Sequence, residues 1–267
     1  MTIAKDHFVL LVSDLLEATR DFETLGFVVS QGNDTRERHN ALVVFSDDSY
    51  FEIVAYKPWL SLKIWGWVRR RGLLSRSLER EDAFISRLWN HWAPRRREGW
   101  IDWCVEVPSV AGFADAARGR GLRIHEMAYG RELADGTPVK WRMGGEADLR
   151  TPFFIEDVTP RVRRLPNRLG RQHPNGVAGV TALRFGVKSL QDAVDGHTRL
   201  FGRRPDELGD TEAVYRFADF TLTLEEIGPA DAEEGLREVT LTSPRVSSPE
   251  KLDTRLSHGA RLVITPA

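Results

Sequence analysis

The sequence predicts an α+β fold built from repeated βαβββ modules. Two observations lead to this expectation. The order strand, helix, strand, strand, strand occurs twice along the 267 residues and returns a third time with one strand fewer, and a shortened copy closes the chain. Three of the helices also share an entry phrase, in which a strand ends on valine and a short polar linker leads to an apolar residue. These phrases lie at 12–15, 107–110 and 187–190.

Apolar spacing and turn signals place each element. In the first module we expect a helix ending at Gly26, over 15–26, and strands at 7–12, 27–31, 41–45 and 50–56. The second module repeats this order with a helix over 109–121 and strands at 102–107, 122–127, 139–143 and 152–158. The third has a helix over 189–202 and strands at 182–187, 213–217 and 220–226. The shortened fourth has a helix over 248–257 and strands at 236–242 and 261–266.

Two segments interrupt the repeat. Residues 57–99 hold five of the eight tryptophans, two arginine triplets and a stretch with helical spacing, so we expect a helical tryptophan-rich insert there. Residues 161–175 are rich in proline, arginine and glycine without periodicity, which is typical of a linker. We therefore expect a first domain over 1–160 and a second, related domain over 176–267.

The insert has three interpretations. It covers a cavity or forms a dimer face, because aromatic side chains bury large apolar areas. It is a lid that moves over a ligand. Or it lies on a membrane surface, since Trp65, Trp67 and the arginines at 69–71 have the composition of an interfacial helix.

Composition excludes several classes of protein. Lys plus Arg total 38 and Asp plus Glu 39, so the chain lacks the basic surface that a nucleic-acid partner requires. No apolar run approaches the ~20 residues of a membrane span, and acidic residues follow the N-terminus too early for a signal peptide. The single cysteine, Cys104, excludes an internal disulfide framework and fits a reducing compartment. We expect a cytoplasmic protein with a small-molecule ligand, without nucleic-acid or membrane partners, and leave a homodimer open.

Strand alternation separates a polar from an apolar face in the second module. Asp102 and Cys104 share one face with Glu106, whereas Trp103 and Val105 share the other with Val107. The apolar face is expected to pack on the helix. The polar face either lines a cavity or faces solvent, as one face of an antiparallel sheet commonly does. Periodicity alone does not choose between these two.

Three motifs carry a resemblance to a known family. They are DHFVLLVSDLLEATRDFETLGF at 6–27, HNALVVFSDDSYFEIVAY at 39–56, and GRELADGTPVKWR at 130–142 followed by TPFFIEDV at 151–158. In order and spacing they resemble the glyoxalase-like family of the vicinal oxygen chelate superfamily, which includes glyoxalases, extradiol dioxygenases and fosfomycin- and bleomycin-resistance proteins. The resemblance implies paired βαβββ modules whose curved mixed sheets enclose a cleft. Beyond residue 176 the chain matches only in module pattern.

The resemblance implies a metal site on the first and last strands of the two N-terminal modules. Carried over by position, the ligands are His7, Glu52, Asp102 and Glu156. Such a set suits a divalent metal (Mg, Mn, Fe, Ni or Zn), with the harder ions favoured over zinc. The chain departs from the superfamily pattern at Asp102, where a second histidine or a glutamine is usual. Three carboxylates then require a bound metal, a protonated carboxyl or a metal-free cavity.

The same motifs suggest further site residues. The catalytic candidates are His39, Glu52 and Glu156, and the substrate-binding candidates are Asn40, Arg131 and Trp141. A neutral imidazole can act as a general base near working pH, and the planar fork of Arg131 can hold a carboxylate or phosphate. The alternatives are a structural histidine at position 39, and for Arg131 a cap or an ion pair with Glu132 or Glu146.

The expected function is an enzyme acting on a small oxygen-rich organic molecule in the N-terminal cleft. The chemistry would be an isomerase or lyase rearrangement through a stabilised enolate, or ring cleavage if iron is bound. The alternatives are a non-catalytic protein that binds or sequesters a planar ligand, of the bleomycin-resistance type, or a vestigial cavity with an interacting insert. In the second domain Ala182 aligns with His7, so we expect packing, specificity or dimerisation there rather than metal chemistry.

Overall fold

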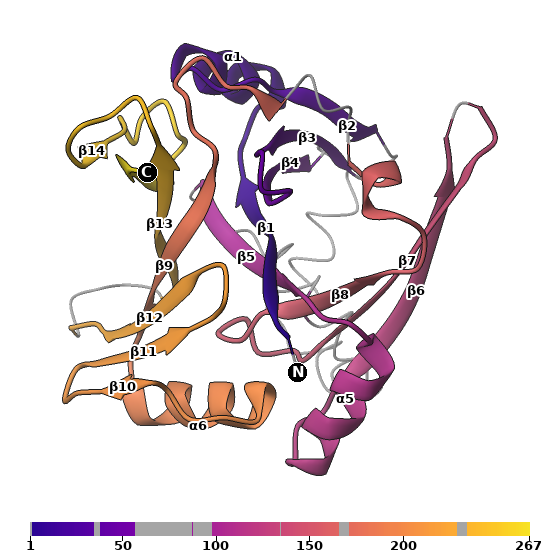
Figure 1. Cartoon of the computed structure of the whole chain (residues 1–267), viewed down its shortest axis with the longest axis vertical. Coiled ribbons are helices and arrows are strands. Elements are labelled where there is room, and N and C mark those ends of the chain that lie inside the picture. Colours follow the sequence, from indigo (N-terminus) through magenta and orange to yellow (C-terminus); the bar gives the residue numbers. More distant parts are fainter. Residues whose placement is uncertain are drawn as a thin grey trace, which may run out of the picture.

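The computed structural model describes residues 2–34, 38–56, 87, 98–133, 135–165, 171–228 and 234–267. It contains two curved mixed sheets, one of eight strands and one of seven (Figure 1). The α+β class and the paired βαβββ modules predicted from the sequence are confirmed. Of the predicted insert at 57–99, only Arg87, Glu98 and Gly99 are described. Within the described part of the chain, no helix is both long and apolar enough to cross a membrane.

The elements follow the predicted order. The first module consists of β1 (Ala4–Leu11), α1 (Leu15–Thr24), β2 (Ser30–Asp34), β3 (Arg38–Val44) and β4 (Tyr50–Tyr56). The second consists of β5 (Gly99–Glu106), α5 (Val110–Gly119), β6 (His125–Glu132), β7 (Pro138–Gly145) and β8 (Phe153–Asp157), followed by a short 3-10 helix (Arg161–Arg163). The third consists of β9 (Gly179–Val187), α6 (Leu190–Phe201), β10 (Glu207–Leu208), β11 (Glu212–Arg216) and β12 (Thr221–Glu226). The fourth has β13 (Gly235–Ser243), β14 (Glu250–Lys251) and β15 (Arg261–Pro266).

The repeated entry phrase forms a helix N-cap. The side chain of Asp14 accepts backbone hydrogen bonds at the start of α1, and Ser109 and Ser189 do the same for α5 and α6. Each cap residue has an extended backbone, so it ends the strand segment while its short side chain satisfies backbone donors of the first helical turn. The polar residue of each phrase therefore fixes where the helix begins.

The two N-terminal modules share one sheet with the order β2-β3-β4-β1-β5-β8-β7-β6. Within each module the first and last strands pair in parallel, and the modules join through the antiparallel pair of β1 with β5. The second sheet repeats this pattern with the order β10-β11-β12-β9-β13-β15-β14. The first strands of both N-terminal modules therefore lie at the centre of the first sheet, with His7 opposite Cys104.

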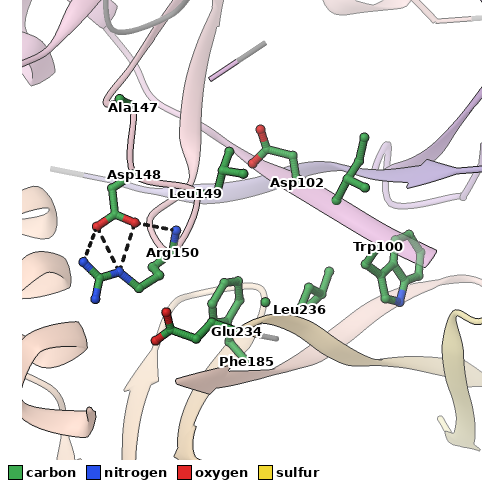
Figure 2. Close-up of a pocket in the computed structure, with 11 residues that line it drawn as sticks. Trp100, Asp102, Ala147, Asp148, Leu149, Arg150, Phe185, Glu234 and Leu236 are labelled. Atoms are coloured by element: carbon green, nitrogen blue, oxygen red, sulfur yellow. Dashed lines mark hydrogen bonds and ion pairs between the residues drawn. The ribbon is translucent and has the colours of Figure 1, made fainter. Parts of the chain in front are cut away.

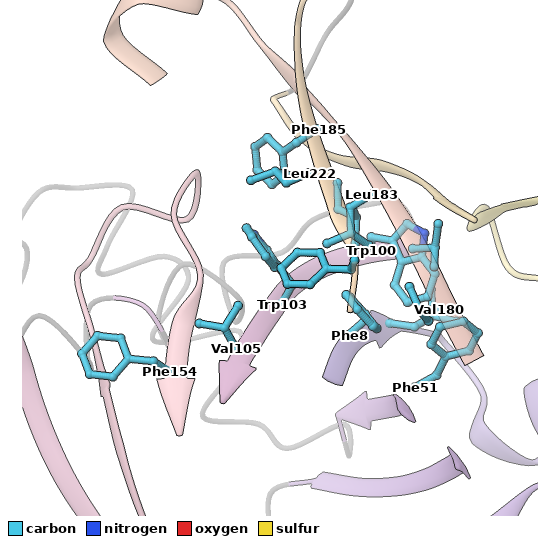
Figure 3. Packing of buried hydrophobic residues seen from close by; sticks show 14 of the residues in the cluster. Phe8, Phe51, Trp100, Trp103, Val105, Phe154, Val180, Leu183, Phe185 and Leu222 are labelled. Atoms are coloured by element: carbon cyan, nitrogen blue, oxygen red, sulfur yellow. The ribbon is translucent and has the colours of Figure 1, made fainter. Parts of the chain in front are cut away.

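The main core lies between the two sheets and beneath the helices. β1 and β5 contribute Phe8 and Trp103, and the second sheet contributes Leu183, Phe185 and Leu222 to the same buried cluster (Figure 3). Burial of these apolar side chains holds the sheets together. Because side chains alternate along a strand, the polar positions of β1 and β5 are left on the opposite face of the first sheet.

The start of β2 differs from the sequence expectation. The strand begins at Ser30 rather than at Phe27, because pairing with β3 starts at Ser30, and the Phe27 side chain packs in the core. The backbone N–H of Val28 donates to Nδ1 of His173 instead of to a neighbouring strand. The apolar run at 27–29 therefore serves packing before the ladder with β3 begins.

The helix expected over 248–257 is not formed. The segment contains the two-residue β14, which pairs with β15, and then a series of turns. The side chain of Asp253 accepts a hydrogen bond from the N–H of Arg255. Such local bonds between side chain and backbone compete with helix formation, which is why the helical spacing is not realised.

A buried histidine in α6 predicts a pH-dependent stability. His197 is fully buried, and burial lowers its pKa from 6.5 to about 4, although its hydrogen bond with the carbonyl of Ala193 opposes the shift. The unfolded chain then binds this proton more readily, so the stability contributed by the neutral ring falls as pH drops below 6.5. We expect protonation of His197 to lower the unfolding free energy of the wild-type protein by about 2 kcal/mol between about pH 7 and pH 5, and His197→Phe to abolish this contribution. Urea unfolding at both pH values measures this, and the neighbouring Phe201→Leu is expected to keep the wild-type pH dependence.

Candidate active site

The face of the first sheet that turns away from the core carries several of the predicted polar residues. Its centre contains His7 from β1, Glu52 from β4 and Cys104 from β5, with Phe153 from β8 beside them. Apolar neighbours form a separate buried cluster on this face, which includes Val54. His7 and Glu52, which the family resemblance placed in one site, therefore lie on the same face of the first sheet.

Asp6 and His7 form a hydrogen-bonded pair on this face. The register between β1 and β5 shifts at Asp6, so the two adjacent residues both turn to the same side. Nδ1 of His7 lies 2.5 Å from Oδ1 of Asp6, and neither side chain is more than slightly exposed. Because the carboxylate accepts this hydrogen bond, the proton of the neutral ring is placed on Nδ1 and Nε2 is left as an acceptor. The imidazole ring is stacked on Tyr50 at 4.7 Å between centroids.

Two arginines from the predicted linker hold the Asp6 carboxylate. Arg164 donates to both of its oxygens, at 3.2 and 2.7 Å, and Arg161 lies 2.9 Å from Oδ2. Arg164 also binds the carboxylate of Asp157 and the hydroxyl of Tyr50. Burial alone would raise the pKa of the Asp6 carboxyl, but Arg164, the His7 hydrogen bond and Arg161 outweigh it and hold the pKa well below its usual range. Asp6 is therefore a fixed negative charge behind His7.

Glu52 faces the other nitrogen of His7. Its Oε2 lies 3.7 Å from Nε2 of His7, and its Oε1 accepts a hydrogen bond of 2.6 Å from Nδ2 of Asn40. The Glu52 side chain is 14% exposed, more than that of His7 at 5%. The carboxylate is thus fixed through one oxygen, while the other stands next to the imidazole at a separation longer than a hydrogen bond.

The structure places His39 on the opposite face of β3 from Asn40. His39 pairs in register with Ala55, whose side chain lies in the core cluster, whereas Asn40 is opposite Val54 on the face of Glu52. The predicted alternation of His39 with Ala41 is present, but that face packs toward the core. His39 is therefore not brought to the His7–Glu52 pair.

Glu156 also lies on the core side of its strand. Its Oε2 accepts a hydrogen bond of 2.8 Å from the N–H of Val110, at the start of α5. On β8 the neighbours Phe153 and Ile155 face the site instead. An odd offset between the motifs of β4 and β8 exchanges the two faces, and this offset separates Glu156 from His7. Phe153 on β8 occupies the position that Glu52 occupies on β4. Glu52 lies opposite Val9, three residues before the valine of its helix entry phrase, and Phe153 lies opposite Cys104, three residues before the valine of its own.

Asp102 is the counterpart of His7 in the second module, and a buried arginine neutralises it. Arg87 donates to both carboxylate oxygens. Its Nε lies 2.7 Å from Oδ2, and its Nη2 donates to Oδ1. Its remaining donors go to the carbonyls of Glu146, Asp148 and Thr151, so all five N–H groups of the guanidinium are used. Arg87 is 1% exposed. The second half of the site is therefore occupied by a saturated ion pair.

The remaining predicted residues are Arg131, Trp141 and Asn40. Nη2 of Arg131 donates to the carbonyl of Arg164, which ties β6 to the chain that carries the Asp6 counter-ions. Trp141 stacks on Tyr129 and packs against the apolar cluster of the site face. Asn40 binds Glu52 as described. Sequence reasoning did not identify Asp6, Arg87 or Arg164, although the DH pair at 6–7 and the arginines after 160 were visible.

The donor atoms present fit a divalent cation held by His7 and Glu52. An imidazole nitrogen and a carboxylate oxygen face each other, and a carboxylate behind the imidazole is the usual partner of a metal-bound histidine. Ligand atoms of Asp6, His7 and Cys104 also lie within 4.8 Å of one another. However, burial raises the pKa of the Cys104 thiol well above its usual value, and Asp6 is engaged by two arginines. The four predicted ligands do not assemble, because Asp102 and Glu156 have the partners given above.

Comparison with solved structures supports the fold. A hypothetical protein from Staphylococcus aureus matches with a TM-score of 0.75 at 15% identity, covering 99% of this chain and 100% of that chain. A Mn(II)-bound glyoxalase from Novosphingobium aromaticivorans matches with a TM-score of 0.53 at 9% identity, covering 98% of this chain and 81% of that one. A triple mutant of 4-hydroxymandelate synthase from Streptomyces coelicolor matches with a TM-score of 0.52 at 15% identity, covering 90% and 71%.

Sequence comparisons give a family. A search of curated proteins finds no match. The glyoxalase-like domain profile, in contrast, matches residues 6–201, which include both N-terminal modules, the linker and the start of the third module. This match agrees with the observed fold and with the position of the His7–Glu52 pair on the site face. The chain belongs to the glyoxalase-like family.

Proposed function

We propose that this protein is an acid–base enzyme that acts on a small organic molecule with two neighbouring oxygens. One observation carries the proposal: Nε2 of His7 and Oε2 of Glu52 face each other at 3.7 Å, and each group is fixed from behind, by Asp6 and Asn40 respectively. Two proton acceptors held in this way can serve two sites of one substrate.

The residues support a proton transfer next to a carbonyl. Glu52, the more exposed of the two, removes the proton from the hydroxyl-bearing carbon next to the carbonyl. Nε2 of His7 accepts the proton of the neighbouring hydroxyl, and the charge of Asp6 stabilises the imidazolium that results. Return of the two protons to exchanged positions completes an isomerisation, and loss of a leaving group instead gives a lyase reaction.

A metal-dependent form of the proposal would have His7 and Glu52 hold a divalent cation in place of the proton transfer to His7, because the single free lone pair on Nε2 of His7 cannot bind a metal and a proton at once. When bound, such an ion would polarise the two substrate oxygens and stabilise the enediolate. One structural neighbour is a Mn(II)-bound glyoxalase, which supports testing Mn²⁺ first. Elemental analysis of protein purified without chelators, compared with a His7→Gln variant, tests this part separately from catalysis.

A binding protein of the bleomycin-resistance type is the second candidate. Phe153 and the Arg87–Asp102 pair take the positions that Glu52 and His7 have in the first module, so half of the paired site has apolar or saturated groups. A site with one acid–base pair and an aromatic wall also suits a planar ligand that is held without turnover.

Deuterium exchange separates the two candidates without knowledge of the product. We expect the protein to catalyse exchange of the carbon-bound proton of a responsive α-hydroxyketone from a small panel in heavy water, followed by proton NMR. Glu52→Gln is expected to lower the exchange rate by about 10²-fold or more, because the base is lost while the hydrogen bond with Asn40 can persist.

Glu156→Gln is the matched control. The Glu156 carboxylate lies at the start of α5, so this variant is expected to keep the wild-type exchange rate. Equal loss in both variants would mean that the exchange does not depend on the His7–Glu52 pair. Saturable binding of panel members without exchange would support the binding protein instead.

A further inference from the structure

The cavity at the junction of the two sheets does not hold the proposed acid–base pair. Its volume is about 370 Å³, and the residues that line it lie on β5, the loop between β7 and β8, β9 and the start of β13 (Figure 2). Two of its charged side chains, Asp148 and Arg150, bind each other. Glu52 instead lies on β4, which β1 separates from β5 in the sheet, and it is fixed by Asn40 on β3. The strands that position Glu52 are therefore β3 and its outer neighbour β2.

A bulge in β2 lies opposite Asn40. The register between β2 and β3 shifts between Gln31 and Asp34, so two residues of β2 stand opposite the single residue Asn40 of β3. The first of the two is Gly32. A bulge of this kind interrupts the regular pairing and re-aims nearby side chains. Because β2 is the outermost strand of the sheet, this irregularity does not have to fit a further strand.

The amide of Asn40 occupies the space that a side chain at position 32 would need. A Cβ atom on Gly32 would stand 2.2 Å from Oδ1 and 2.9 Å from Cγ of Asn40. Both separations are far shorter than van der Waals contact. Gly32 does not have a positive φ, so the requirement at this position is for space and not for an unusual backbone angle. Glycine therefore leaves room for the amide in the orientation that it has.

That orientation determines what the amide offers to Glu52. A carboxylate only accepts hydrogen bonds, so the amide must present Nδ2 to it, and Nδ2 lies 2.6 Å from Oε1 of Glu52. Oδ1 is then turned toward Gly32. Asn40 is buried, at 6% exposed. Contacts thus run from Gly32 through Asn40 to Glu52, across three neighbouring strands, and end 3.7 Å from Nε2 of His7.

We propose that Gly32 is a positioning residue of the acid–base site, which acts on Glu52 through the amide of Asn40. The expected effect on rate rests on the proposed function, whereas the contacts themselves do not depend on any reaction. A methyl group at position 32 would displace Oδ1, the far end of a short side chain, so we expect the strand ladder to be kept and the hydrogen bond with Glu52 to be lost. The carboxylate can then rotate away from its place beside His7.

The first test reads the amide directly and needs no substrate. In proton–nitrogen NMR of the full chain, one Nδ2 proton of Asn40 is expected downfield and in slow exchange with water, because Glu52 holds it. Gly32→Ala is expected to abolish both features, and Asn40→Ala assigns the signal. The control is Gly119→Ala, where a Cβ atom meets nothing within 4 Å. An unchanged Asn40 amide in Gly32→Ala overturns the proposal.

The second test measures exchange of the panel α-hydroxyketone that responds best in heavy water. Gly32→Ala is expected to lower kcat by about tenfold or more through displacement of the base, with KM kept within about twofold. Asn40→Ala is expected to do the same. Adding Gly32→Ala to Asn40→Ala is expected to change the rate by no more than about twofold, since the two act through one amide. A further tenfold loss in the double variant would refute the proposal.

The double variant also covers a failure of Gly32→Ala to fold. If the added methyl group clashes with the amide alone, Asn40→Ala restores the fold, and a double variant that remains unfolded by circular dichroism refutes the assignment. Wild-type protein without exchange of any panel member would reject the proposed function. The amide measurement would then still decide whether Gly32 sets the contact between Asn40 and Glu52.

Discussion

Replacing Arg87 with alanine is expected to destabilise the protein by about 3–5 kcal/mol. The change leaves the Asp102 carboxylate buried without its cation, and it leaves the carbonyls of Glu146, Asp148 and Thr151 without their donor. Removing one partner of a buried ion pair costs far more than the net stabilisation of the pair, because the remaining charge keeps its desolvation penalty. Urea unfolding followed by circular dichroism measures the change.

Arg184→Ala is the matched control for this prediction. Arg184 pairs with Glu225 and Glu212 in the second sheet, but its side chain is 39% exposed. We expect its loss to change the unfolding free energy by no more than about 1 kcal/mol. The double variant Arg87→Met with Asp102→Leu is expected to recover part of the stability, since the buried carboxylate is removed as well. A similar effect of Arg87→Ala and Arg184→Ala would contradict the buried-pair interpretation.

Asp6→Asn is expected to change both the stability and the state of His7. The substitution removes a buried negative charge between Arg161 and Arg164, which we expect to cost about 3–5 kcal/mol. It also replaces the acceptor that fixes the Nδ1 proton of His7. The asparagine amide can offer either a donor or an acceptor, so the preference for one imidazole tautomer is expected to weaken. Long-range proton–nitrogen NMR of the His7 ring reports the tautomer directly.

A purely structural role for Asp6 would lower stability without changing the ring. The control is Asp48→Asn, because the Asp48 carboxylate also binds an arginine of the predicted linker, Arg171, but is 46% exposed. Asparagine tolerates the positive φ of 68° at this position. We expect Asp48→Asn to have little effect on stability and none on the His7 tautomer. An unchanged tautomer in Asp6→Asn would reject the positioning role of Asp6.

Much of the fold could be predicted from the sequence because its signals are local. The helix entry phrases carry Asp14, Ser109 and Ser189, and each of these caps a helix. His7 and Glu52 were identified by the family resemblance of the motifs at 6–27 and 39–56 and not by alternation. Where the prediction of an element failed, as at 248–257, a turn built by the Asp253 side chain competed with a weak helical pattern.

The rest of the site depends on features that a periodic pattern does not encode. The shift in register at Asp6 puts two consecutive residues on one face, although alternation predicts opposite faces. Glu156 lies three positions after Phe153, the residue that corresponds to Glu52, and an odd number of positions puts it on the other face of the strand. The pairing of Arg87 with Asp102 joins residues whose neighbourhood is set by the sheet and not by spacing along the chain.

The saturation of Arg87 limits how this protein can be shortened. A minimal version that replaces residues 57–97 with a tight connection between β4 and β5 would delete the arginine that neutralises Asp102, together with the donor for three loop carbonyls. Such a trimmed chain would need an apolar residue at position 102 and a rebuilt loop between β7 and β8 to fold. The tryptophan-rich segment therefore cannot be treated as a removable appendage of an otherwise complete sheet.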